Sequence, residues 1–199
     1  MRRAILVLGA ALALAGCEPY RPASLDDVAA ARYVSEAPPS VTLISMVNNR
    51  TGRSAHSALL INGSQQVLYD PAGTFSHPDL PRRDDIHYGM TPRFVDYYER
   101  YHARFSHHVE AHRVPISLAQ ADQLIANAQA EGKALKMHCA LAVADVLRPV
   151  PPFGNVPRSY YPEGLRADFA AMPGVRTSYV RESDVGKNSA WERSGATPP

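Results

Sequence analysis

The chain has little cysteine and no excess of charge of either sign. Its 199 residues include only two cysteines, Cys17 and Cys139, and carry a formal net charge of +2. A charge so close to neutral, with no dense block of lysine and arginine, excludes an electrostatic interface for nucleic acid. Two cysteines are too few for a four-cysteine zinc centre, and no HExxH motif is present. We therefore predict neither a metal nor another cofactor, and no nucleic-acid partner.

Histidine is the remaining metal-binding type, and four histidines fall close together: His102, His107, His108 and His112. The adjacent rings of His107 and His108 would point to opposite faces of a strand. Along the same strand, His108 and His112 would lie about 13 Å apart, which is too far for one ion. The spacing therefore argues against a zinc site formed by these residues alone.

Long apolar runs are also absent, apart from the N-terminus. Arg2 and Arg3 precede an apolar stretch over residues 4–15, which is too short to span a bilayer as a permanent helix. Small residues and then Cys17 follow at once. This pattern resembles the lipobox of bacterial lipoproteins. The resemblance implies cleavage before Cys17 and acylation of its sulfur and of the new amine. An ordinary secretory signal that ends in cysteine is the alternative.

The lipoprotein resemblance also implies a location. Glu18, rather than Asp, follows the cysteine, and by the enterobacterial sorting rule this favours the outer membrane, with the protein facing the periplasm. Two or three acyl chains would hold the protein stably at the membrane, because one chain alone is marginal. The membrane, through the lipid on Cys17, is thus an expected partner. The sequence does not define an oligomeric state.

Composition divides the rest of the chain into segments. After the signal, roughly 180 residues remain, enough for one domain with a core. Before residue 40, prolines flank a short helical pattern. After about Gly186 the hydrophobic periodicity is lost, which is typical of a flexible tail. Trp191 in this tail is expected to dock back on the domain. The predicted segments are a signal peptide (1–16), the lipidated cysteine and a tether (17–39), a folded domain (40–185) and a flexible tail (186–199).

The folded domain is predicted to be α+β, with an antiparallel sheet packed against a cysteine-bearing helix. Asn62-Gly63-Ser64 predicts a hairpin turn, Thr91-Pro92 and Ser117 predict helix starts, and Gly132 and Pro149 predict helix ends. The expected strands are 41–47, 56–61, 66–69, 105–116 and 175–180. The expected helices are 92–101, 118–131, 139–147 and 163–171, with a long connection over 74–91.

Cys139 is the candidate nucleophile. If lipid consumes Cys17, Cys139 has no disulfide partner in an oxidising compartment. At the first turn of a helix its sulfur would lie near free backbone N–H groups and the positive end of the helix dipole, which favour the thiolate. The N–H of Cys139 would belong to an oxyanion hole. The competing interpretation is a buried cysteine that acts as a small hydrophobic residue.

His56 is the candidate base, and Asp70 the candidate group that orients it. A cysteine nucleophile needs an imidazole to take its proton, and the imidazole needs a polar partner to hold its tautomer. A hairpin loop of about three residues would place Asp70 opposite His56 on one face of the sheet. Gln65 and Gln66 are weaker candidates for the third residue. Asp70 before Pro71 is also an ordinary turn former.

The order of these elements resembles a known superfamily. The segment Ala55–Ile61, the hairpin, Tyr69–Gly73, and the helix that follows His138 are similar to circularly permuted NlpC-type papain-like cysteine hydrolases. Lecithin:retinol acyltransferase-like proteins share this arrangement. The match covers residues 41–150. One departure is His138, because the residue before the cysteine is often Asn in such proteins. His138 is expected to be a surface residue, a residue that supports the catalytic side chains, or an alternative base.

The resemblance implies a papain-like domain that cleaves an amide or peptide bond with Cys139 and His56, in cell-wall peptide. A lipid acyltransferase or thioesterase that uses the same dyad is one alternative. A non-catalytic envelope lipoprotein that serves as a binding or scaffold module is the other. A peptidase needs an open polar cleft at Cys139, whereas a lipid enzyme needs an apolar groove. A scaffold would bury Cys139 or separate it from His56.

Overall fold

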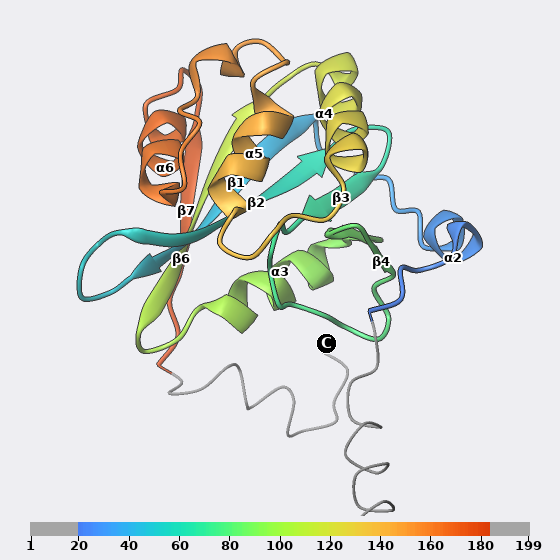
Figure 1. Cartoon of the computed structure of the whole chain (residues 1–199), viewed down its shortest axis with the longest axis horizontal. Helices are drawn as coiled ribbons and strands as arrows, with labels where there is room; N and C mark the ends of the chain where they lie inside the picture. The colour runs from blue at the N-terminus through green and yellow to red at the C-terminus, as the bar shows by residue number, and fades with distance from the viewer. Residues whose placement is uncertain (1–19, 184–199) are drawn as a thin grey trace, which may run out of the picture.

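One antiparallel sheet of seven strands runs through the centre of the molecule, in the order β4-β5-β3-β2-β1-β6-β7 (Figure 1). The structure is a computed structural model and describes residues 20–183. The strands are β1 (Ser40–Asn48), β2 (Ser54–Asn62), β3 (Gln66–Tyr69), β4 (Arg82–Arg83), β5 (Ile86–Tyr88), β6 (His107–Pro115) and β7 (Arg176–Val180). The α+β class and the antiparallel sheet are thereby confirmed.

Helices cover both faces of this sheet. They are α2 (Leu25–Ala30), α3 (Pro92–His102), α4 (Leu118–Glu131), α5 (Cys139–Leu147) and α6 (Pro162–Ala170). Helices α4, α5 and α6 pack on one face and share one apolar cluster with the sheet, whereas α3 packs on the other face within a second cluster (Figure 1). The molecule is thus a three-layer arrangement, with the sheet between two apolar cores.

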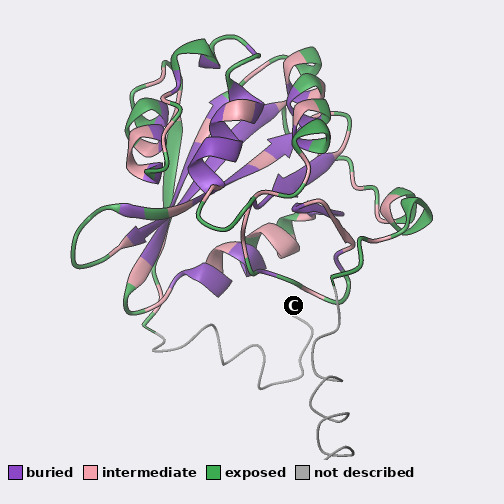
Figure 2. Cartoon of the chain, in the orientation of Figure 1, coloured by how far each residue is buried: buried purple, intermediate pink, exposed green. Residues whose placement is uncertain are grey.

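Helix α5 lies at the middle of its face and is apolar on almost every side. Of its nine residues, all but Asp145 are buried (Figure 2). A helix that is apolar all round has no solvent face and must be enclosed by other elements. Here β2 lies beneath it and α4 and α6 lie beside it. This enclosure holds the N-terminal end of α5 in a defined place on the sheet.

Strands β4 and β5 were not predicted, because they fall in the segment expected to be a long connection. They have only two and three residues, too few for an alternating pattern to be recognised. They form because β5 pairs with β3, from Val67↔Tyr88 to Tyr69↔Ile86. The connection is therefore folded back along the edge of the sheet.

The segment expected to be a tether makes contacts with the domain in its described part, residues 20–39. Ala23 donates a backbone hydrogen bond to Arg82, and the carbonyl of Tyr33 accepts one from Gln66. Cys17, the predicted signal peptide and Trp191 lie outside the described residues. Within residues 20–183, no helix is both long and apolar enough to cross a membrane.

Candidate active site

Three elements bring the predicted residues Cys139, His56 and Asp70 together. His56 lies in the first half of β2, Asp70 directly follows β3, and Cys139 is the first residue of α5. The Nε2 atom of His56 lies 2.6 Å from Oδ1 of Asp70. The imidazole also interacts with the Cys139 thiol by hydrogen bonding and by charge. Because Asp70 occupies Nε2, the nitrogen left for the sulfur is Nδ1.

The hairpin explains how Asp70 reaches His56. The loop between β2 and β3 has three residues, since Asn62 pairs with Gln66. The ladder ends at Leu59↔Tyr69. One further step would therefore place Asp70 beside Ala58, two residues from His56 and on the same face. The predicted face is right, but the directly opposite position is not, and the side chains meet along a diagonal.

Asp70 is completely buried and receives a second hydrogen bond, 3.0 Å long, from the Tyr98 hydroxyl on α3. Burial opposes ionisation of this carboxyl. The hydrogen bond and charge of His56 outweigh burial and lower the pKa of Asp70 well below its usual range. The same burial, with the Asp70 charge, raises the pKa of Tyr98, so the phenol stays protonated as a donor. Sequence reasoning missed the role of Tyr98, because the spacing of Tyr97, Tyr98 and Tyr101 indicates helix packing or the lining of a cleft, and not a bond to Asp70.

The thiol of Cys139 is biased toward the thiolate. Burial of the sulfur opposes ionisation, but the hydrogen bond and charge of His56, with the backbone groups of Ser57 and Ala140, lower its pKa. Helix α5 has no side-chain cap at His138, so the sulfur does not compete with a cap for the first-turn N–H groups. Strand β3 pairs with β2 only from Leu59 onward, which leaves the Ser57 backbone open to the sulfur.

The imidazole of His56 is biased toward the imidazolium. Burial alone would lower its pKa, but Asp70 and Cys139 outweigh burial and raise the pKa of His56 to about 10. About 20% of the side chain is exposed. The arrangement therefore favours a thiolate–imidazolium pair, which is the reactive form of a cysteine nucleophile.

A close backbone approach keeps the Asp70 carboxylate in place. A Cβ atom added to Gly73 would lie 1.9 Å from Asp70 Oδ2. Only glycine therefore fits at this point of the turn after β3. The carboxylate has little room to move, because His56 and Tyr98 both hold Oδ1.

A second buried carboxylate, Asp85, joins the two segments that carry the site, and sequence reasoning missed it. Its Oδ2 accepts from the backbone N–H of Ala72 at 3.0 Å and from that of Ala134 at 3.1 Å, while Arg82 pairs with its other oxygen. Ala72 belongs to the turn after Asp70, and Ala134 precedes the cysteine helix. Asp85 thus ties the two chain segments to each other. Its only sequence signal is an acidic residue in a turn.

An open cleft of about 290 Å³ lies against His56. Its lining combines apolar groups, such as Met46 and Ala55, with the polar side chains of Thr74, His102, Arg104, Ser106 and His107. His102 lies behind His56, with the ring centroids 6.4 Å apart, and burial lowers its pKa to about 4. His102 and His107 thus both lie at this cleft.

The other two histidines of the sequence cluster lie on a different part of the sheet. His108 and His112 on β6 are close to Glu110, which pairs with Arg166. No group of three or more potential metal-ligating side chains occurs within residues 20–183.

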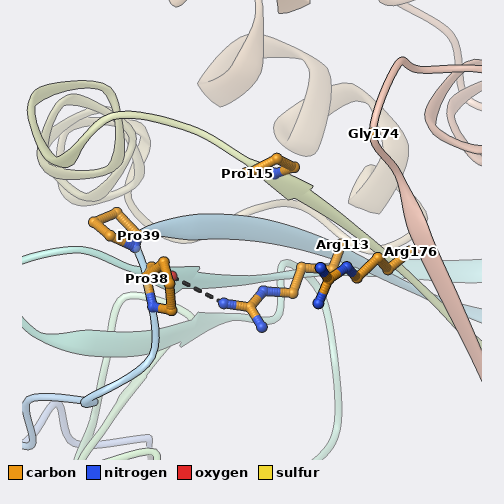
Figure 3. Close-up of a pocket in the computed structure, with 6 residues that line it drawn as sticks. All are labelled: Pro38, Pro39, Arg113, Pro115, Gly174 and Arg176. Atoms are coloured by element: carbon orange, nitrogen blue, oxygen red, sulfur yellow. Dashed lines mark hydrogen bonds between the residues drawn. The ribbon is translucent and has the colours of Figure 1, made fainter.

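A separate pocket lies far from the dyad, at the end of the sheet where β1 begins (Figure 3). Three prolines, Gly174 and two arginines line it. Arg113 donates to the carbonyl of Pro38 at 2.9 Å, and Arg176 lies opposite Arg113 on β7. This pocket contains none of the predicted catalytic residues.

No protein-family model matches the chain, and no curated protein or solved structure is significantly similar to it. The function must therefore be argued from the geometry and chemistry of the site.

Proposed function

We propose that this chain is a cysteine hydrolase of papain-like type, in which Cys139 attacks an amide or peptide bond with the help of His56. The observation that carries the proposal is the position of the His56 ring, whose Nε2 lies 2.6 Å from the buried Asp70 carboxylate and which also interacts with the Cys139 thiol. The order of base, carboxylate and cysteine along the chain supports a permuted papain-like domain, as does the cysteine at an uncapped helix start.

The chemistry follows from this geometry. The sulfur of Cys139 bonds to the carbonyl carbon, and the negative charge on the carbonyl oxygen is stabilised by first-turn N–H groups of α5. His56 gives its proton to the leaving nitrogen, the C–N bond breaks, and an amine departs from a thioester. A water molecule then loses a proton to His56 and attacks the thioester carbon. The acid is released and the thiolate–imidazolium pair is restored.

The polar side chains that line the cleft beside His56 support a peptide substrate over an acyl chain. In a lipidated envelope protein the available peptide is that of the cell wall, which we propose as the substrate. We also propose an anchor on Cys17 in the outer membrane. Loss of the chain from the membrane fraction in Cys17→Ser, but not in wild type, tests the anchor.

One observation favours a lipid substrate as the second candidate. Four apolar or aromatic side chains near the start of α5 or before α6 are strongly exposed: Leu135, Met137, Tyr160 and Tyr161. The Tyr160 ring contacts the ring of His138, the residue before the nucleophile, at 5.2 Å between centroids. An acyl chain could lie along these side chains, in which case the dyad would transfer or hydrolyse an acyl group.

Alkylation of the purified chain by iodoacetamide across pH tests the dyad. Cys139 is 6% exposed, so a purely structural thiol would stay inert until the protein unfolds. We expect Cys139 of the wild type to be alkylated rapidly well below pH 9. In His56→Ala, the alkylation rate at pH 6 should be about 100-fold lower. His108→Ala is the matched control and should leave the rate unchanged. An inert thiol in the folded wild type would support the scaffold alternative and overturn the enzyme.

A comparison of substrates then separates the two enzyme candidates. Wild type and Cys139→Ser are assayed on peptidoglycan fragments and on lipid esters. Release of an amine from the fragments, absent in Cys139→Ser, is the expected result. Turnover of the lipid esters alone would favour the acyltransferase or thioesterase.

A further inference from the structure

The cleft beside His56 has a one-sided charge. Its lining contains one arginine, Arg104, and no carboxylate. Asp70 lies behind His56, fully buried, and is held by its own partners. A cleft lined in this way favours a ligand with negative charge.

Arg104 lies in the turn between α3 and β6, and hydrogen bonds fix the backbone of this turn. Its backbone N–H and carbonyl both pair with His107, at 2.7 and 3.0 Å. The side chain of Asn49 donates to the carbonyl of Phe105 at 2.8 Å, and the backbone N–H of Asn49 donates to the carbonyl of Ser106 at 2.9 Å. The turn between α3 and β6 is thus fastened to the end of β1. The guanidinium group is presented from a fixed backbone.

Only part of the Arg104 guanidinium group makes hydrogen bonds within the described residues. Its Nε donates to the carbonyl of His102 at 3.3 Å. Within residues 20–183, no carboxylate pairs with Arg104, and its two terminal nitrogens have no hydrogen-bond partner among these residues. By contrast, Arg82, Arg158 and Arg166 each pair with a carboxylate. An arginine that lines a cleft and has unpaired terminal nitrogens can bind a carboxylate through two parallel hydrogen bonds.

The two other basic side chains of the lining do not share this role at neutral pH. Burial lowers the pKa of His102 to about 4, and burial with the nearby Arg104 charge lowers the pKa of His107. Both rings are therefore largely neutral. Apart from the His56 imidazolium, Arg104 is the permanent cation of the cleft lining.

We propose that the cleft binds an acidic peptide, and that Arg104 holds a carboxylate of this peptide beside the amide that Cys139 attacks. The inference rests on the proposed cysteine hydrolase and adds its substrate class. Arg104 would act on specificity and not on the bond-breaking step. Its removal should therefore weaken the reaction of acidic substrates and spare neutral ones.

Two peptidyl acyloxymethyl ketones, identical except for Glu or Gln next to the reactive carbonyl, test this proposal on the full chain. We expect wild type to alkylate Cys139 about 10- to 100-fold faster with the Glu probe, the range expected for a charged hydrogen bond. Arg104→Gln should remove this preference without slowing the Gln probe, and Arg104→Lys should retain part of it. Arg50→Gln, which removes an exposed arginine outside the cleft lining, should behave as wild type.

Three outcomes would overturn the proposal. The first is equal labelling by the two probes in wild type. The second is a Glu preference that survives in Arg104→Gln, since His56 alone would then explain it. The third is reaction with iodoacetamide but with neither ketone, because the cleft would then not accept a peptide. A thiol that is inert to iodoacetamide as well identifies failure of the hydrolase itself.

Discussion

Within residues 20–183, two histidines are hydrogen-bonded to a buried carboxylate, His56 to Asp70 and His108 to Glu110, and the two pairs differ in what surrounds them. Nε2 of His108 lies 3.1 Å from Glu110, and its Nδ1 lies 2.6 Å from the Asn49 side chain. Both ring nitrogens of His108 are therefore engaged. In the other pair Asp70 engages one nitrogen of His56, and the other side of the ring faces a thiol.

The carboxylates differ in the same way. Arg166 pairs with Glu110 at 2.7 Å and also pairs with Glu163. Arg166 is a permanent cation, and it lowers the pKa of Glu110 together with the hydrogen bond from His108. Asp70 has no arginine or lysine partner among the described residues, so His56 supplies the positive charge. A histidine–carboxylate pair is therefore a candidate catalytic base only where no arginine or lysine pairs with the carboxylate and one nitrogen of the imidazole remains free.

The largest expected effect comes from removing the charge of each carboxylate in turn. Asp70→Asn should lower the rate of Cys139 alkylation at pH 6, and any kcat, by about 100-fold, because the imidazolium loses its partner. Glu110→Gln should leave both rates unchanged but lower the free energy of unfolding by about 2–3 kcal/mol, because Arg166 loses part of its pairing. Rates and urea unfolding are measured on both variants. Equal rate losses would show that the two pairs have the same role.

A smaller effect is expected from crowding Asp70 without changing it. In Gly73→Ala the new Cβ would overlap the carboxylate, which must shift away from His56. We expect the alkylation rate at pH 6 to fall about tenfold and the unfolding free energy to fall by about 1–3 kcal/mol. Gly154→Ala is the matched control, since its new Cβ would meet nothing closer than 3.9 Å. A Gly73→Ala variant that reacts like wild type would contradict the fixed position of Asp70.

The smallest effect is expected in the pH dependence of the unfolding free energy. The pKa of His56 is raised from 6.5 to about 10, so its stabilisation is complete below pH 6.5 and is lost as pH rises toward 10. The pKa of Cys139 is lowered from 9.0, so its stabilisation is present above pH 9 and is lost as pH falls through the native pKa. Above pH 6.5 and the native pKa of Cys139, and below pH 9, the native pair and the unfolded chain carry the same number of protons, so the two pH slopes cancel.

Substitution of the thiol should reveal the histidine contribution. In Cys139→Ser, the unfolding free energy should fall by up to about 1.4 kcal/mol per pH unit above pH 6.5, relative to the wild type. Asp70 still raises the pKa of His56 in this variant. Urea unfolding at pH 6.5, 7.5 and 8.5 measures the difference. Parallel curves for the two proteins would show that no ion pair forms in the native state.

Much of the local structure could be predicted because short-range rules decide it. Asn62-Gly63 sets the hairpin, Ser117 caps a helix with a side-chain bond to Gln120, and the apolar run after Cys139 ends before Pro149. The common face of His56 and Asp70 follows from a three-residue loop and the two-residue period of a strand. These features need only neighbours in the chain.

Other parts of the site could not be predicted, because their partners are distant in the sequence. Tyr98 reaches Asp70 from a helix packed on the opposite face of the sheet from α5, and its spacing is that of any buried aromatic. Asp85 joins Ala72 to Ala134 only because β5 folds back along β3. Arg104 is recognisable only once its turn is seen beside the His56 cleft.

The sequence by itself determined the candidates: one cysteine at a helix start, one histidine on a strand and one acid after the next strand. Residue type, capping and strand period are local properties, and the linear chain carries them in full. Only the tertiary structure decided that the three side chains meet, which histidine–carboxylate pair a fixed cation satisfies, and which cleft leads to His56. Those outcomes depend on burial and on contacts between distant segments, which set the pKa of each group.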